Sequence, residues 1–164
     1  IVLDVDEPLT VGADRVVNTL AARKLYARDT IVVDFGTATT FDCITAEGRF
    51  IGGVIAPGVR TAAENLIRRA AKLPETELTA PERVIGRRTE ECIQAGVLYG
   101  TADAVDGIVR RIRAEWPGGG SPRVVATGGL AAVVAPLTTS IEQTHPDLTL
   151  QGLRIAARHL GLDW

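Results

Sequence analysis

The chain has 164 residues, of which 46% are hydrophobic and 23% are charged, as is usual for a globular domain that buries a core. Its formal net charge of −2 argues against nucleic acid as a partner, because binding to a phosphate backbone requires a basic face. No apolar stretch approaches the roughly 20 residues of a membrane span, and we therefore expect a cytoplasmic protein without a membrane partner.

The first part of the chain is predicted to form an irregular segment and a helix. Residues 1–10 contain Pro8 and several acidic residues and are expected to be extended or loop-like. From Gly12 to about Tyr26 the apolar residues recur at helical spacing, which predicts an amphipathic helix.

Three strands are predicted next. The run "TIVVDFG" (30–36) is apolar, β-branched and bounded by glycine, which is typical of a buried strand. Residues 40–58 predict two further strands joined at Glu47-Gly48, a hairpin signal. We expect the three strands to pair consecutively and antiparallel.

Two helices follow, separated by a loop at residues 74–88, which contain two prolines. The first helix, at residues 58–73, is alanine-rich and is expected to turn Leu66, Ile67 and Ala70 inward. The second begins with Thr89 as its N-cap and continues to about residue 114, and its apolar positions share one face: Ile93, Val97, Ala104, Ile108 and Ile112.

Three glycines, Gly96, Gly100 and Gly107, thin the same face of this long helix. They would let another helix approach closely, either from the same chain or from a second copy. The two cysteines, Cys43 and Cys92, lack the spacing of a metal site, and we expect both to be buried, reduced thiols.

The last part of the chain contains one more strand and two helices. After a flexible loop at 116–122, residues 123–129 predict a strand that ends in two glycines, and 130–137 a short helix. A final amphipathic helix starts near Asp147 or Thr149. Because the strands are segregated from most of the helices, we predict an α/β domain.

The segment "DFGTATT" is the first candidate site. Gly36 lets the backbone approach a ligand closely, and Thr37, Thr39 and Thr40 offer hydroxyl and backbone N–H groups that can hold phosphate oxygens. The carboxylate of Asp34 suits a hard cation. The alternative is an ordinary hairpin whose threonines favour strands, and spacing alone does not decide between the two.

Two further segments can carry chemistry. In "VGADRVVN" Asp14 could accept a proton from a substrate hydroxyl and Arg15 could grip an anion, although Asp14 could also simply favour the helix start. In "ATGGLA" Gly128 and Gly129 offer a flat backbone surface for a stacked ring or a phosphate, or only a tight turn.

Six segments in order resemble the type III pantothenate kinases: "VGADRVVN", "VVDFGTATTFD", "GGVIAPGV", "VIGRRTEECIQAGVLYG", "VVATGGLA" and "DLTLQGLR". The resemblance runs from about residue 4 to residue 160. It implies a ribonuclease-H-like fold of the actin-like ATPase type, with ATP-dependent phosphorylation of pantothenate to 4′-phosphopantothenate, the first step of coenzyme A biosynthesis.

The resemblance also implies roles for individual residues. Asp14 would be the catalytic general base, and Gly12, Ala13, Arg15 and Thr89 would bind pantothenate with it. Asp34 would hold the K⁺ (or NH4⁺) that the family requires. ATP, bound with Mg²⁺, would meet Gly36, Thr37, Gly128 and Gly129, and the long helix would form a homodimer with the pantothenate site near the partner subunit.

Two departures from the family qualify this picture. The position nine residues before Asp14 is Val5, where many members have an aromatic residue. No segment matches the family's DxGNT phosphate motif, and the sequence has no methionine. We therefore interpret residues 1–164 as the C-terminal domain of a kinase whose N-terminal domain, of roughly 100 residues, is absent, and we expect little activity from it alone.

Two other functions remain open at this stage. One is a non-catalytic dimerising or regulatory module derived from the kinase, because some relatives are described as accessory factors for transcription. The other is an actin-like kinase that acts on a sugar or on acetate.

Overall fold

The computed structural model describes residues 1–162, which fold around one six-stranded mixed sheet with the strand order β1-β4-β3-β2-β5-β6. The central strands β2, β3 and β4 pair antiparallel, as predicted, while β5 pairs parallel with β2 and β1 parallel with β4. The strands are β1 (Val2–Leu3), β2 (Thr30–Phe35), β3 (Ala38–Ile44), β4 (Arg49–Pro57), β5 (Arg123–Thr127) and β6 (Gln143–Thr144).

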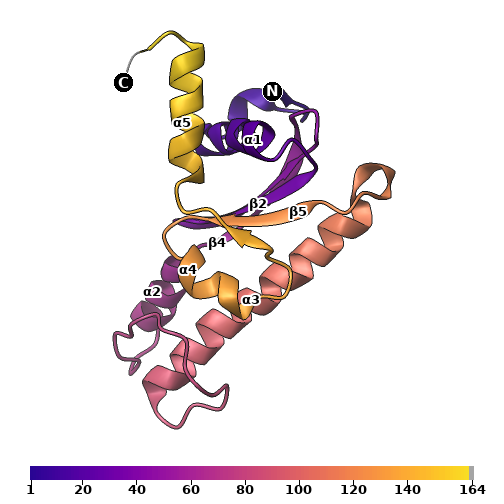
Figure 1. Ribbon diagram of the computed structural model, residues 1–164. Coiled ribbons are helices and arrows are strands. Elements are labelled where there is room, and N and C mark those ends of the chain that lie inside the picture. The colour runs from indigo at the N-terminus through magenta and orange to yellow at the C-terminus, as the bar shows by residue number, and fades with distance from the viewer. Residues whose placement is uncertain (163–164) are drawn as a thin grey trace.

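Helices cover both faces of the sheet (Figure 1). On one face, α1 (Ala13–Leu25) packs against α5 (Leu148–His159). On the other lie α2 (Val59–Arg69), α3 (Thr89–Glu115) and α4 (Ala131–Val134). The short 3-10 turns are η1 (Pro8–Thr10), η2 (Pro117–Gly119) and η3 (Ala135–Leu137).

The side chains of β2 alternate between two cores, because successive residues of a strand point to opposite faces. Ile31 and Val33 belong to the core that α3 covers, together with Leu98 of that helix. Val32 belongs to the core that α1 and α5 cover, together with Leu148. Burial on both faces explains why this strand is a continuous apolar run.

The helical boundaries agree with the predicted ones better than the helical faces do. α2 ends at Arg69, and Leu66, which was expected to point inward, is 46% exposed. On α3 the prediction of the buried face is also wrong in part, since Ala104 is exposed. The buried positions of α3 are instead Ile93, Ala95, Leu98, Ala102, Val105 and Val109.

The first turn of α3 also differs from expectation. The N-cap is Arg88, which makes no side-chain capping hydrogen bond, and Thr89 is the first residue of the helix. Cys92, in the same turn, is exposed, so the prediction of two buried thiols holds only for Cys43. The start of α3 projects beyond the sheet (Figure 1), so only the preceding loop lies against this turn, where Sγ of Cys92 donates a hydrogen bond to the carbonyl oxygen of Gly86 at 3.5 Å.

Within residues 1–162, no helix combines the length and the apolar character that crossing a membrane requires.

Candidate active site

Asp14 lies in the first turn of α1, which begins after Gly12 without a side-chain cap. Its side chain is exposed, and its Oδ1 accepts a hydrogen bond from the backbone N–H of Arg15 at 2.9 Å. Ala13, the first residue of the helix, is exposed as well. The carboxylate is therefore open to a ligand and has one fixed hydrogen bond.

The side chain of Arg15 turns the other way, onto the sheet. Its Nε donates to Oδ1 of Asp42 at 2.6 Å, and its Nη2 donates to the carbonyl oxygen of Phe41 at 3.4 Å. The guanidinium lies over the ring of Phe50, 5.0 Å from the ring centroid. Only 14% of the side chain is exposed, so the protein encloses most of the Arg15 side chain.

Asp34 lies near the end of β2, on the same face of the sheet as α1. Its Oδ2 accepts a hydrogen bond from Nδ2 of Asn18 at 3.2 Å, and Oδ1 of Asn18 accepts one from Oγ1 of Thr149 at 2.8 Å. Burial raises the pKa of Asp34, the hydrogen bond from Asn18 opposes this, and the charge of Asp14 adds to it. The polar chain thus joins α1, β2 and α5.

Asp42 is a third acid on this face, and the sequence analysis did not single it out. Its side chain is fully buried. Burial raises the pKa of Asp42 to about 6, Arg15 opposes the shift, and the charges of Asp34 and Asp14 add to it. A signal was available in the sequence, since an acid inside the otherwise apolar run "TTFDCI" demands a buried partner.

The turn after β2 meets the turn after β5. Gly128 has a φ of 92°, and a Cβ there would lie 2.4 Å from Oδ1 of Asp34. The backbone N–H of Leu130 donates to the carbonyl oxygen of Phe35 at 3.4 Å. Because β2 and β5 are parallel neighbours, their carboxyl ends share one edge of the sheet, and Gly129 lies open beside them.

Thr37, in the turn between β2 and β3, is exposed and stands next to the start of α2. Its carbonyl oxygen accepts a hydrogen bond from Oγ1 of Thr61 at 2.9 Å. Thr39 and Thr40 lie in β3 and are buried. Of the three threonines in "TATT", only Thr37 is therefore placed to reach a ligand at the turn, together with the exposed Gly36.

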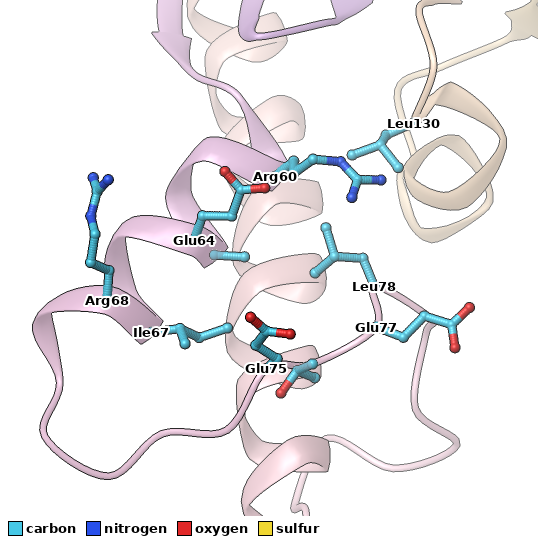
Figure 2. Close-up of a pocket in the computed structure, with 10 residues that line it drawn as sticks. Arg60, Glu64, Ile67, Arg68, Glu75, Glu77, Leu78 and Leu130 are labelled. Atoms are coloured by element: carbon cyan, nitrogen blue, oxygen red, sulfur yellow. The ribbon is translucent and has the colours of Figure 1, made fainter.

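A cavity of about 620 Å³ extends from Leu130 along α2. Figure 2 shows Leu130 and Leu78 at its apolar side and Arg60 reaching toward Leu130. The opposite wall carries Glu64 and Ile67 of α2. The cavity therefore begins beside the glycine turn and offers both apolar and charged groups.

Thr89 stands apart from the other candidate residues. It lies at the exposed start of α3, on the opposite face of the sheet from α1 (Figure 1). The structure therefore brings Asp14, Arg15 and Asp34 together within one chain but does not bring Thr89 to them.

Among residues 1–162, no group of three or more His, Cys, Asp and Glu side chains could hold a metal ion. The donor set at Asp34 is instead one carboxylate in a glycine-lined corner, where Oδ1 faces the backbone of Gly128. A single carboxylate is too few protein ligands for Mg²⁺, which would need further ligands such as substrate phosphates and waters.

Comparisons with known proteins show the family of the chain. The family model described as type III pantothenate kinase matches residues 1–111. The type III pantothenate kinase of Moorella thermoacetica is 52% identical over 150 residues, and that of Saccharopolyspora erythraea is 52% identical over 153 residues. Each match covers 92% of this chain and 58% of the relative, so the chain spans little more than half the length of these kinases.

Solved structures show the fold. A Baf family transcriptional activator from Campylobacter jejuni superposes with a TM-score of 0.65 at 19% identity, covering 98% of this chain and 69% of that protein. The activator of the 2-hydroxyisocaproyl-CoA dehydratase from Clostridium difficile, solved with bound ADPNP, superposes with a TM-score of 0.53 at 14% identity. This match covers 90% of this chain and 68% of that protein. The fold is ribonuclease-H-like. On the family match and the sequence identities, the chain belongs to the type III pantothenate kinase family.

Proposed function

We propose that the protein phosphorylates pantothenate with ATP to give 4′-phosphopantothenate, the first step of coenzyme A biosynthesis, in the cytoplasm. The observation that carries the proposal is the convergence of Asp14 and Asp34 on one face of the sheet, where Asn18 of the Asp14 helix hydrogen-bonds to Asp34. A base for the alcohol and an anchor for a cation then share one site.

Asp14 acts as the general base on the hydroxyl of pantothenate. Its exposed carboxylate can accept the proton, while the backbone N–H of Arg15 holds Oδ1 at 2.9 Å and so leaves Oδ2 for the substrate. Gly12 and Ala13 line the same substrate pocket with the backbone of Arg15, whose side chain is held on the sheet. Phosphoryl transfer is achieved mainly by positioning and by charge neutralisation, which is what this arrangement supplies.

ATP lies at the two turns that end β2 and β5. Thr37 and Gly36 contact its phosphates, and Gly128 and Gly129 contact its adenosine, whose base enters the cavity beside Leu130 (Figure 2). Asp34 holds K⁺ or NH4⁺, which supplies positive charge next to the phosphates when bound. Mg²⁺ enters with the nucleotide, and the family's DxGNT phosphate motif, which no segment of this sequence matches, would complete its binding site.

A homodimer accounts for the position of Thr89. On α3, Gly96 and Gly100 are exposed, and a Cβ at either position would meet nothing within 4 Å. They line an apolar groove of about 510 Å³ that also includes Leu66 and Ile108. This favours packing between two copies over packing within one chain, and the partner's α3 would bring a second Thr89 to the pantothenate site.

A non-catalytic dimerising or regulatory module is the second candidate. It is favoured by the similarity in fold to a protein described as a Baf family transcriptional activator. An assay of phosphate transfer from radiolabelled ATP to pantothenate distinguishes the two candidates. Turnover by the intact protein supports the kinase, and its absence with ATP, Mg²⁺ and K⁺ present would overturn it. Residues 1–164 alone are expected to turn over little, and full turnover would show that the phosphate motif is dispensable.

A further inference from the structure

The ion pair between Arg15 and Asp42 is the only buried one among the salt bridges described for residues 1–162. The side chain of Asp42 is 0% exposed, and its Oδ2 has no hydrogen-bond partner. A buried ion pair is costly to desolvate and is often no better for stability than apolar residues of the same volume. Stability alone is therefore a weak reason for its presence.

The surroundings of Arg15 fix its guanidinium in one place. Asp42 accepts a hydrogen bond from Nε, the carbonyl oxygen of Phe41 accepts one from Nη2, and the guanidinium lies over the ring of Phe50. Gly53 makes room, because a Cβ there would lie 2.6 Å from Nη2. A planar cation bound at Nε and Nη2 and stacked on a ring has little freedom to move.

The same residue also fixes the turn that carries Asp14. The backbone N–H of Arg15 donates to Oδ1 of Asp14, and the backbone oxygen of Arg15 accepts a hydrogen bond from Oγ1 of Thr19 at 2.8 Å. An anchored Arg15 side chain therefore anchors the first turn of α1, where there is no side-chain cap to do so.

We propose that Asp42 is a positioning residue that acts through Arg15 to fix the orientation of the Asp14 carboxylate. The path is the Asp42 carboxylate, the Arg15 guanidinium, the Arg15 backbone N–H and Oδ1 of Asp14. The functional part rests on the proposed role of Asp14 as general base. The geometric part is independent of it and can be tested without a substrate.

The kinetic test uses the intact protein with Asp42→Asn, Asp42→Leu and Arg15→Met. We expect Asp42→Leu to lower kcat at least tenfold with the KM for ATP within twofold, and Asp42→Asn to lose less, because an amide oxygen can still accept from Nε. The matched control is Asp4→Asn, which removes the exposed ion pair between Asp4 and Arg49 and should leave kcat unchanged.

The double variant tests the path. If Asp42 acts through Arg15, adding Asp42→Leu to Arg15→Met should change kcat by less than twofold. If the double variant instead loses kcat by the product of the two single losses, the path is overturned. The path is also overturned if both Asp42→Asn and Asp42→Leu keep the wild-type kcat. Where Asp42→Leu does not fold, Asp42→Asn and Arg15→Lys carry the kinetic test.

A spectroscopic arm separates this proposal from the proposed function. In an ¹⁵N-labelled protein, the backbone amide signal of Arg15 reports its hydrogen bonds to Oδ1 of Asp14 and to the carbonyl oxygen of Gly12, and Asp14→Asn supplies the reference for a changed carboxylate. We expect Asp42→Asn to shift this signal, while Asp4→Asn does not. An unmoved signal overturns the positioning path even if pantothenate is turned over, and absence of turnover in the wild-type protein overturns the proposed function alone.

Discussion

The backbone of Gly128 lies so close to Asp34 that a methyl group at residue 128 would stand 2.4 Å from the carboxylate oxygen Oδ1. The glycine also has a φ of 92°, which L side chains rarely adopt. The parallel pairing of β2 with β5 brings the turn after β5 to the end of β2. The glycine is therefore required twice, by the backbone angle and by the neighbouring carboxylate.

The first prediction concerns Gly128→Ala. We expect it to lower kcat/KM for ATP at least tenfold and to raise the concentration of K⁺ needed for half-maximal activity, because the methyl group would clash with Oδ1 of Asp34 and with the backbone of Phe35. Gly118→Ala is the matched control, since Gly118 also has a positive φ of 69° but a Cβ there would meet nothing within 4 Å. Equal losses in both variants would attribute the effect to backbone strain rather than to the clash.

The second prediction is a pH dependence of stability. Burial raises the pKa of Asp42 from 3.8 to about 6 in the folded protein, against the opposing effect of Arg15. The folded state then binds this proton more tightly than the unfolded state. The resulting stabilisation is complete below about pH 4 and is lost as the pH rises through 6, by about 3 kcal/mol in total.

Urea unfolding between pH 4 and pH 7.5 measures this effect. The free energy of unfolding of the wild-type protein, minus that of Asp42→Asn, should fall by about 2–3 kcal/mol over this range. Asp42→Ala should give the same slope, because neither replacement titrates. A difference that rises with pH would contradict the raised pKa.

The third prediction is that Asp14→Asn lowers kcat by about 10²–10⁴-fold, the usual contribution of a general base. The KM for ATP and the KM for pantothenate should change little. The amide keeps the size of the side chain and can still accept the hydrogen bond from Arg15, so only the basicity is removed. Glu47→Gln, in the exposed turn between β3 and β4, is the control and should retain full activity. A kcat within threefold of the wild-type value would exclude Asp14 as the base.

The fourth prediction tests whether Thr89 acts on the partner's site. Asp14→Asn and Thr89→Ala proteins, each nearly inactive, are mixed and allowed to exchange subunits. A mixed dimer has one site with both residues intact, so activity should recover to about a quarter of the wild-type level in a statistical mixture. No recovery, with mixed dimers shown by mass spectrometry, would place both residues in the same subunit's site or remove Thr89 from the site.

The central strands were predictable from the sequence because their signals are local. β-branched runs bounded by glycine, with a Glu47-Gly48 turn, give β2, β3 and β4 as found. The glycine turn at Gly128 and the acid at Asp34 were singled out for the same reason. Both break an apolar pattern at the end of a strand, and such a break indicates a polar environment before any fold is known.

The errors came from tertiary contacts, which periodicity does not encode. On α3 a broad stripe of small and apolar residues surrounds half of the helix, so the sequence cannot say which side meets the sheet, and Ala104 was assigned to the wrong side. Leu66 on α2 was likewise expected to be buried from its helical spacing alone, although it is exposed. The partnership of Asp42 with Arg15 joins residues that are distant in sequence and depends on the packing of α1 against β3.

The two thiols differ in a way that makes the protein convenient to label. Burial raises the pKa of the Cys43 thiol to about 12, and the neighbouring Asp42 carboxylate adds to the shift, so maleimides should not react with it in the native state. Cys92 is exposed, three residues after Thr89. A single fluorophore can thus be attached beside the proposed subunit boundary without engineering, and energy transfer between labelled copies would report their association directly.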